Sequence, residues 1–283
     1  TVAGTFTSNV VKAAPVLWDK QIVEHSAFAQ AVVVNSGIAN ACTGRQGLDC
    51  CEAEAKCAGE LLGVPTDAVL VASTGVIGMQ IPVDKITAGI KKLVTAKADT
   101  LEAGSDAAHA IMTTDTISKE IAIETEIGGK TVTLGGMCKG SGMIHPNMAT
   151  TLAYVTTDAK CDSADLQKML HNAIDKSFNM CTVDGDTSTN DTMILLANGA
   201  SGVEVKTEED KAALAGLIEH ICIDMARRIA SDGEGATHLI VVESYGLPTE
   251  HDARLVAKAI AGMQIVKVIF VKNKLINLIV KPQ

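Results

Sequence analysis

Short apolar runs recur along this chain and alternate with longer amphipathic stretches. The runs have the length of buried strands and are bounded by Gly, Asn, Asp or Ser, as strand ends commonly are. Residues 121–127 alternate in part, and Gly128 and Gly129 supply the positive φ angles of a tight turn before residues 130–134, which predicts a β-hairpin. Buried strands are predicted at residues 31–34, 68–72, 152–155, 193–197 and 238–242.

Helical periodicity fills the stretches between these strands. Asp162 or Ser163 can cap a helix whose apolar residues follow at three-and-four spacing. Thr207 and Asp210 resemble a capping box ahead of a longer apolar stripe, which Gly233 can end. Shorter helices are predicted at residues 51–62, 82–94 and 106–112.

Strands and helices mix without strict alternation or a fixed repeat. This favours an α/β fold, in which sheets and helices stack as an α+β layered sandwich. With 283 residues, 47% of them hydrophobic, the chain can bury a substantial core in one compact unit. Only four Phe, two Tyr and one Trp occur, so aliphatic side chains must build that core.

Charge and composition exclude some classes of binding partner and location. A formal net charge of −9, no basic stripe and few aromatic residues argue against nucleic acid. Three lysines, Lys267, Lys272 and Lys274, interrupt the most apolar stretch, so no membrane span is predicted. Eight scattered cysteines are typical of reduced thiols, which predicts a cytoplasmic protein. The chain begins at Thr1 without a leader, so no targeting signal is read from it.

The densest chemistry lies in a glycine-rich loop, residues 135–152, which runs into an apolar strand. It is not a phosphate loop, because Glu124 stands where the first glycine of that motif belongs. A threonine at such a boundary can attack the preceding carbonyl and release itself as a new N-terminus. Its α-amine, with a pKa of about 8, can then serve as base for its own hydroxyl. The residues alone do not distinguish Thr150 in this role from an ordinary threonine at a strand edge.

Metal and histidine chemistry receive weaker support. Cys50, Cys51 and Cys57 fit one helix with chance thiols better than a metal site, so neither a metal nor another cofactor is expected. His145 lies near Thr150 and could act as a general base, although a packing or turn role is the favoured interpretation.

Several segments together resemble one family. The segment K-G-S-G-M-I-H-P-N-M-A-T at residues 139–150 resembles the autocleavage signature of the ornithine acetyltransferase family, also called the bifunctional glutamate N-acetyltransferase family. The resemblance extends over about residues 1–262 and implies N-terminal-nucleophile-like chemistry. Further segments similar to that family follow in its order at residues 4–15, 35–44, 73–78, 111–115, 182–191 and 232–237.

The resemblance implies a cleavage site between Ala149 and Thr150. It would yield an α chain of residues 1–149 and a β chain of residues 150–283, which remain together in one compact fold. In the family, a threonine and a glycine of an S-T-G motif form the oxyanion hole, a role that falls to Thr74 and Gly75 here.

Substrate contacts carried over from the family fall on four residues. They are Thr113, Lys139, Glu234 and Thr150 itself. A lysine can pair with the carboxylate of an amino acid, and a glutamate can pair with the side-chain ammonium of ornithine.

The implied reaction belongs to arginine biosynthesis and is a double displacement. Thr150 takes the acetyl group of N2-acetyl-ornithine and passes it to glutamate, with no cofactor. The resemblance leaves open whether acetyl-CoA also serves as donor. It further implies that the α and β fragments associate as a heterotetramer with two copies of each.

Departures from the family keep alternatives open. Ile38 stands where the family usually has Asn, and residues 263–283 no longer resemble it, so the C-terminal region is expected to be incomplete or atypical. One rival interpretation is an N-terminal-nucleophile aminopeptidase or amidase, in which water replaces glutamate as acceptor. Another is a truncated relic without catalysis.

Overall fold

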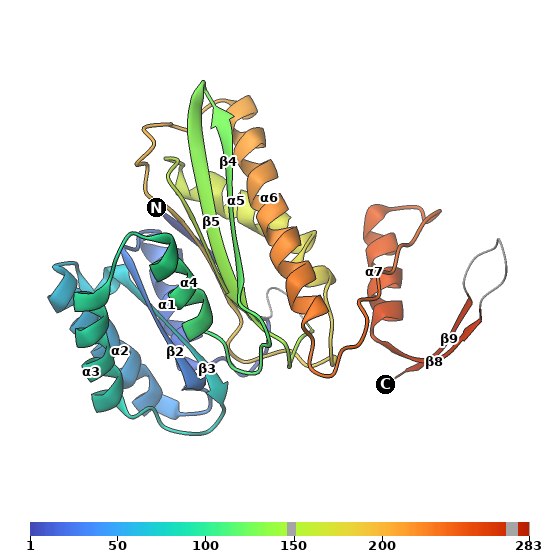
Figure 1. Cartoon of the computed structure of the whole chain (residues 1–283), viewed down its shortest axis with the longest axis horizontal. Helices are drawn as coiled ribbons and strands as arrows, with labels where there is room; N and C mark the ends of the chain where they lie inside the picture. The colour runs from blue at the N-terminus through green and yellow to red at the C-terminus, as the bar shows by residue number, and fades with distance from the viewer. Residues whose placement is uncertain (146–150, 270–276, 283) are drawn as a thin grey trace.

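The computed structural model describes residues 1–145, 151–269 and 277–282, and its centre is a five-stranded sheet (Figure 1). The strand order is β1-β7-β6-β5-β4; β6 and β7 run parallel, and the other neighbours run antiparallel. The strands are β1 (Val2–Phe6), β4 (Lys119–Ile127), β5 (Lys130–Lys139), β6 (Leu152–Thr157) and β7 (Thr192–Ala197).

Helices α5 (Ser163–Asp175) and α6 (Glu208–Ser231) cover one face of this sheet. Alternating side chains of the strands explain why both faces are apolar. In β6, Ala153 and Val155 pack toward these helices, whereas Leu152 and Tyr154 belong to the core on the opposite face.

A second, parallel sheet of β2 (Ala31–Ile38) and β3 (Val69–Val76) packs on that opposite face. Leu70 and Ala72 of β3 share a core with β6, and Val69 and Val71 point away toward another helical layer. The helices on this side are α1 (Ala14–His25), α2 (Gly44–Leu62), α3 (Val83–Ala96) and α4 (Leu101–Ala110). The layering, with helices outside two sheets, confirms the predicted α/β sandwich (Figure 1).

Local signals in the sequence are largely confirmed. Gly128 and Gly129 join β4 to β5 with φ angles of 60° and 75°, as a tight hairpin turn requires. Asp162 caps α5, and Thr207 with Asp210 forms both bonds of a capping box at α6. The predicted helix at residues 51–62 begins earlier, at Gly44. Elements β1 and α1 were not predicted, and neither were the helix at residues 250–261 and the strands at residues 263–269 and 277–282.

The predicted strand at residues 238–242 is wrong. This segment is irregular, and Ile240 and Val241 are 55% and 72% exposed. An apolar run becomes a strand only when another strand pairs with it, and within the described part of the chain none does. The chain then forms α7 (Glu250–Ala261) and a hairpin of β8 (Met263–Ile269) and β9 (Asn277–Pro282), set apart from the layered body (Figure 1).

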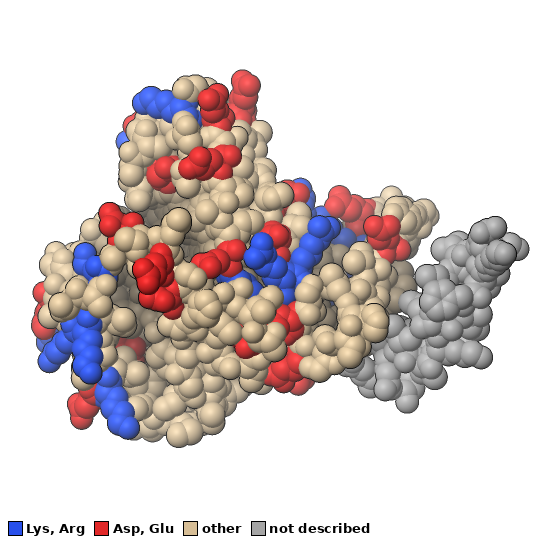
Figure 2. Space-filling view, viewed as in Figure 1, with Lys and Arg blue, Asp and Glu red and all other residues tan. Residues whose placement is uncertain are grey.

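Across the described ranges, no helix is both long and apolar enough to span a bilayer. On the face drawn in Figure 2, lysine and arginine side chains lie among acidic ones and form no continuous basic stripe.

Candidate functional site

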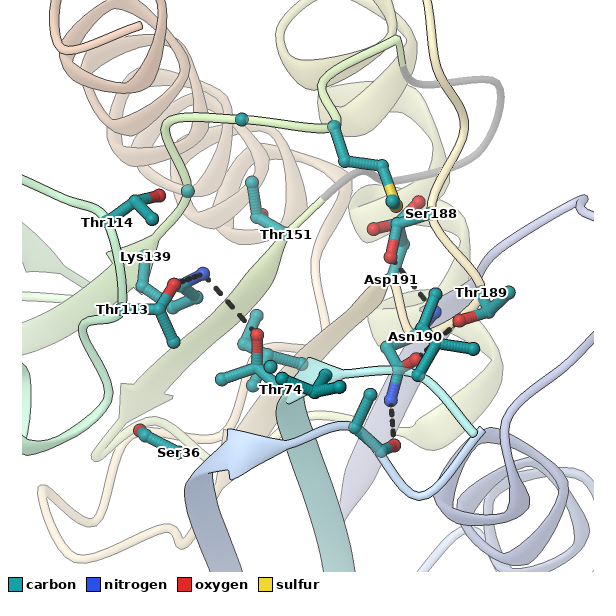
Figure 3. Close-up of a pocket in the computed structure, with 18 of the residues that line it drawn as sticks. Ser36, Thr74, Thr113, Thr114, Lys139, Thr151, Ser188, Thr189, Asn190 and Asp191 are labelled. Atoms are coloured by element: carbon teal, nitrogen blue, oxygen red, sulfur yellow. Dashed lines mark hydrogen bonds between the residues drawn. The ribbon is translucent and has the colours of Figure 1, made fainter. Parts of the chain in front are cut away.

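A cavity of about 640 Å³ opens beside the ends of β3 and β5 and the start of β6 (Figure 3). Its wall combines hydroxyl side chains, glycines and two charged residues, Lys139 and Asp191. Four of the predicted site residues line it together: Thr74, Gly75, Thr113 and Lys139.

Lys139 is the hub of the polar wall. Its ammonium donates a hydrogen bond to the Thr113 hydroxyl at 2.7 Å and to the Thr74 hydroxyl at 3.4 Å (Figure 3). The three residues come from three places: the end of β5, the loop after α4, and β3. A hydroxyl that accepts a bond from the lysine keeps its own proton free to donate into the cavity.

Gly75 is required by close backbone packing. Its φ is +129°, and β3 pairs it with Gly37 of β2. A Cβ on Gly75 would lie 2.2 Å from the carbonyl carbon of Gly37, closer than any real contact. The two glycines therefore let the ends of β2 and β3 approach at the rim of the cavity.

Burial lowers the pKa of Lys139, and the nearby carboxylate of Asp115 opposes this effect. The Lys139 ammonium lies 3.8 Å from the carboxylate of Asp115. This ion pair favours the charged form of Lys139 at the cavity wall.

A buried ion network stands behind the lysine, and we call Asp115, Lys119 and Asp232 the buried triad. The Lys119 ammonium contacts Asp115 at 2.7 Å and Asp232 at 2.6 Å, and its side chain is fully buried. Asp115 also accepts the backbone N–H of Gly140 at 2.7 Å. The triad thus fixes the end of β5, including Lys139, to the end of α6.

Hydrogen bonding overcomes burial in both carboxylates of the triad. Burial alone would raise the pKa of Asp115, but bonds from Gly140 and Lys119 and the charge of Lys139 lower it overall. The pKa of Asp232 is lowered in the same way, against burial, by bonds from Lys119 and Thr116.

Glu234 lies outside the cavity wall, on the far side of the loop that carries Gly142. A Cβ on Gly142 would lie 2.5 Å from the Glu234 carboxyl, so only a glycine lets the two segments pack this closely. The backbone N–H of Glu234 donates to the Ser141 carbonyl at 2.8 Å. Among the predicted substrate contacts that lie in the described residues, Glu234 is therefore the one that does not line the cavity.

The predicted cleavage residues Ala149 and Thr150 lie outside the described residues. Thr151, the covalent neighbour of Thr150, is buried and lines the cavity, and its carbonyl accepts the backbone N–H of Thr192 at 2.8 Å. His145 does not line this cavity. Its ring nitrogen contacts the Thr182 hydroxyl at 3.0 Å, which agrees with a packing role.

Sequence reasoning missed polar residues that build the site. Asn190, just before β7, donates to the carbonyls of Ala39, which follows β2, and of Ser73 in β3 (Figure 3). Asp191 follows it in the wall. Both residues end a segment that resembles the family, so the signal was present, but only tertiary contacts give these residues a role.

Among the described residues, no three His, Cys, Asp or Glu side chains are grouped to hold a metal ion. Cys50, Cys51 and Cys57 lie on α2 as free thiols. Cys51 accepts a hydrogen bond from Asn40 and serves the packing of that helix.

The layers define an α/β protein with a cavity, walled in part by polar side chains, where two sheets meet. The ArgJ family model matches residues 1–274, and the chain belongs to this family. The family expected from the motifs is therefore confirmed.

Named relatives agree with this assignment. The chain is similar to the arginine biosynthesis bifunctional protein ArgJ of Symbiobacterium thermophilum, with 51% identity over 267 residues, which cover 94% of this chain and 66% of that protein. The protein of the same name from Lactococcus lactis is 48% identical over 270 residues, with the same coverage of 94% and 66%. The chain thus spans just under two thirds of the length of these relatives.

A solved structure is also similar. The crystal structure of arginine biosynthesis bifunctional protein ArgJ from Bacillus halodurans has 46% identity and a TM-score of 0.49, and the match covers 53% of this chain and 75% of that one.

Proposed function

We propose that this chain is a glutamate N-acetyltransferase, that is, an ornithine acetyltransferase of arginine biosynthesis. It transfers the acetyl group of N2-acetyl-ornithine to glutamate through an ester on Thr150. The observation that carries the proposal is the convergence of Lys139, Thr113 and Thr74 on one cavity, which Thr151 also lines. Membership of the ArgJ family and the relatives' shared name support it.

Maturation comes first in this proposal. The Thr150 hydroxyl attacks the carbonyl of Ala149, and the amide C–N bond breaks as the ester forms, which frees the α-amine of Thr150. Water then hydrolyses the ester, which frees the hydroxyl and leaves a carboxylate on Ala149. The amine then acts as base for the hydroxyl beside it. Backbone pairing supports a stable two-fragment product, because β5 pairs with β6 and β1 pairs with β7 across the proposed cut.

The oxyanion of the tetrahedral intermediate is held by Thr74 and Gly75. The Thr74 hydroxyl accepts from Lys139 and so directs its own proton elsewhere. A preorganised donor in a site that excludes water contributes about 3–4 kcal/mol to transition-state stabilisation. Gly75 contributes a backbone that no side chain shields.

The amino-acid substrate is oriented by charge. Lys139, with Thr113 beside it, binds the α-carboxylate of ornithine or glutamate. Glu234 attracts the side-chain ammonium of ornithine from behind Gly142, where its packing puts a carboxylate close to the cavity rim.

The proposal extends to assembly and to a second donor. The two fragments pair and dimerise into a heterotetramer in the cytoplasm, which light scattering of the purified protein tests. Acetyl-CoA serves as an alternative donor and needs no other cofactor. Incubation with acetyl-CoA and glutamate should release free CoA, and no release would remove this part alone.

Denaturing gel electrophoresis with mass spectrometry tests the central claim. Purified protein should give two fragments, the second beginning at Thr150, and N2-acetyl-ornithine should add an acetyl group to that residue. Thr150→Ala should abolish both results. Thr156→Ala, which removes an exposed hydroxyl from β6, is the matched control.

The rival functions give different results in these assays. An aminopeptidase or amidase would hydrolyse acetyl-ornithine equally with and without glutamate. A non-catalytic relic would give one intact band and no adduct. Two fragments from Thr150→Ala would overturn the assigned cleavage site.

A further inference from the structure

Lys139 and Asp191 are the charged residues in the described part of the cavity wall. The Lys139 ammonium donates to two hydroxyls there, whereas Ser188 engages only part of the Asp191 carboxyl. Asp191 is 2% exposed, yet its Oδ2 has no hydrogen-bond partner among the described residues. A buried carboxylate oxygen left unpaired is costly, so it marks a place where a ligand is expected to supply the partner.

Backbone contacts hold Asp191 firmly in place. Its carbonyl accepts the N–H of Thr7 at 2.9 Å, and the next residue, Thr192, donates to the Thr151 carbonyl at 2.8 Å. Asp191 therefore sits directly beside the start of β6, with Ser188 next to it (Figure 3). Among the described residues, Lys139 and both the hydroxyl and the backbone N–H of Ser188 act on its carboxyl.

The proposed reaction includes one proton transfer to which no group has yet been assigned. An amide nitrogen carries one proton, but ornithine leaves as an ammonium with three, so it must gain two. One comes from the Thr150 hydroxyl through the Thr150 amine. Glutamate enters as an ammonium and must lose one proton before its nitrogen can attack. The same single proton is thus needed in the first half-reaction and released in the second.

We propose that Asp191 is the acid–base group that handles this second proton, and that its free oxygen binds the substrate amine. The inference rests on the proposed function and adds a catalytic residue to it.

The steps balance. In the first half-reaction, the C–N bond of acetyl-ornithine breaks as the C–O bond to Thr150 forms, and protonated Asp191 gives its proton to the departing amine. In the second, the glutamate ammonium gives a proton to the Asp191 carboxylate. Its nitrogen then bonds to the acetyl carbon, the C–O bond breaks, and the remaining excess proton on nitrogen goes to the Thr150 oxygen. Asp191 ends protonated, as it began.

The electrostatics suit this cycle. Burial raises the pKa of Asp191 well above its usual range, and the Ser188 bond and the positive charge of Lys139 oppose that rise only in part. A carboxyl of this kind keeps its proton at a higher pH than an exposed one. General acids and bases work best when their pKa lies near the ambient pH, so the raised pKa favours this role.

Asp191→Asn tests the inference, because it removes the ionisable group and keeps the side-chain shape. The acetyl-Thr150 enzyme is formed first, and its deacylation rate is measured with glutamate and with hydroxylamine. Glutamate arrives protonated, whereas hydroxylamine is already unprotonated at neutral pH. We expect the variant to lose about 100-fold or more in the glutamate rate and far less in the hydroxylamine rate. Asp49→Asn, on the exposed surface of α2, is the charge-matched control.

Equal losses with both nucleophiles, or no loss, would overturn the role of Asp191. If the Asn variant does not mature, Asp191→Ser makes the same comparison with a smaller side chain. The unaltered protein gives a further test: the glutamate rate should fall on acidification through an ionisation that leaves the rate per unprotonated hydroxylamine unchanged. Parallel profiles would contradict the inference. Absence of any acetyl-Thr150 in the unaltered protein would instead defeat the proposed function itself.

Discussion

Two groups of charges lie on either side of Lys139, and they differ in how completely they are paired. In the buried triad, Lys119 joins both carboxylates within 2.7 Å, and backbone N–H groups satisfy them further. In the cavity, Oδ2 of Asp191 has no hydrogen-bond partner in the described part of the chain. The difference teaches that buried charge alone does not mark a functional group. A fully paired cluster fixes the position of its neighbours, and a partly paired one can still bind a ligand.

Loss of the central cation of the triad should have the largest effect. Lys119→Met leaves Asp115 and Asp232 buried without their shared partner, so it should lower the free energy of unfolding by about 3–5 kcal/mol. Urea unfolding followed by circular dichroism measures this. A loss no greater than that of an exposed lysine would mean that the triad does not bear on stability.

Gly75→Ala should have the next largest effect, because it changes the backbone at the rim of the cavity. The added Cβ meets Gly37 and also forces a side chain into a positive φ, at about 1–3 kcal/mol for the backbone strain alone. Acetyl transfer should fall more than stability does, because the ends of β2 and β3 separate at the cavity rim. Gly89→Ala in α3, where a Cβ meets no neighbour, is the control in the same two assays.

The free energy of unfolding should depend on pH in opposite directions for Asp115 and Asp191. Asp115 has a lowered pKa in the fold, so its contribution is present above about pH 4 and is lost as the pH falls through the lowered value. Asp191 has a raised pKa, so its contribution is complete below about pH 4 and is lost as the pH rises through the raised value.

At pH 7, therefore, Asp115→Asn should destabilise the protein, whereas Asp191→Asn should leave it as stable or make it more so. The Asp191 difference should shrink as the pH falls toward 4, whereas the Asp115 difference should shrink only below about pH 4. Urea unfolding at pH 7 and pH 5 checks the signs, and a destabilised Asp191→Asn at pH 7 would mean that its carboxylate is paired after all.

The smallest effect on stability and activity is expected for an ion pair on the exposed surface. Lys160 contacts Glu204 at 2.6 Å, with side-chain exposures of 65% and 40%. Water and salt screen such a pair, so Lys160→Met should leave unfolding and acetyl transfer within experimental error. A clear loss would show that pairing matters even without burial.

Much of the fold could be predicted because its signals are local. The glycine pair of the hairpin and the capping box of α6 each depend on a few adjacent residues. Helix α1 was missed because its first turn holds no acidic residue and its buried face includes Asp19, which looks like a surface residue in the sequence. The error at residues 238–242 has the opposite cause, since an apolar run cannot reveal whether a partner strand exists.

The site was predictable only in part, for a related reason. Thr74, Thr113 and Lys139 were assigned through family motifs, and the structure brings them together. Asp115 and Asp191 also lie in segments that resemble the family. The sequence alone, however, does not show whether a carboxylate has a hydrogen-bond partner. Only the fold distinguishes them, because Asp115 is completed by Gly140, 25 residues away along the chain, whereas Oδ2 of Asp191 has no partner among the described residues.

The central sheet interleaves strands from before and after residue 149, since β7 lies between β1 and β6, and β6 pairs with β5. Cleavage of the chain at that point would leave two fragments whose strands are hydrogen-bonded to one another in a single sheet. Neither piece could then be withdrawn or replaced without melting the sheet. Subunit exchange between matured molecules should therefore be as slow as global unfolding, and each molecule should keep for its lifetime the two pieces from which it formed.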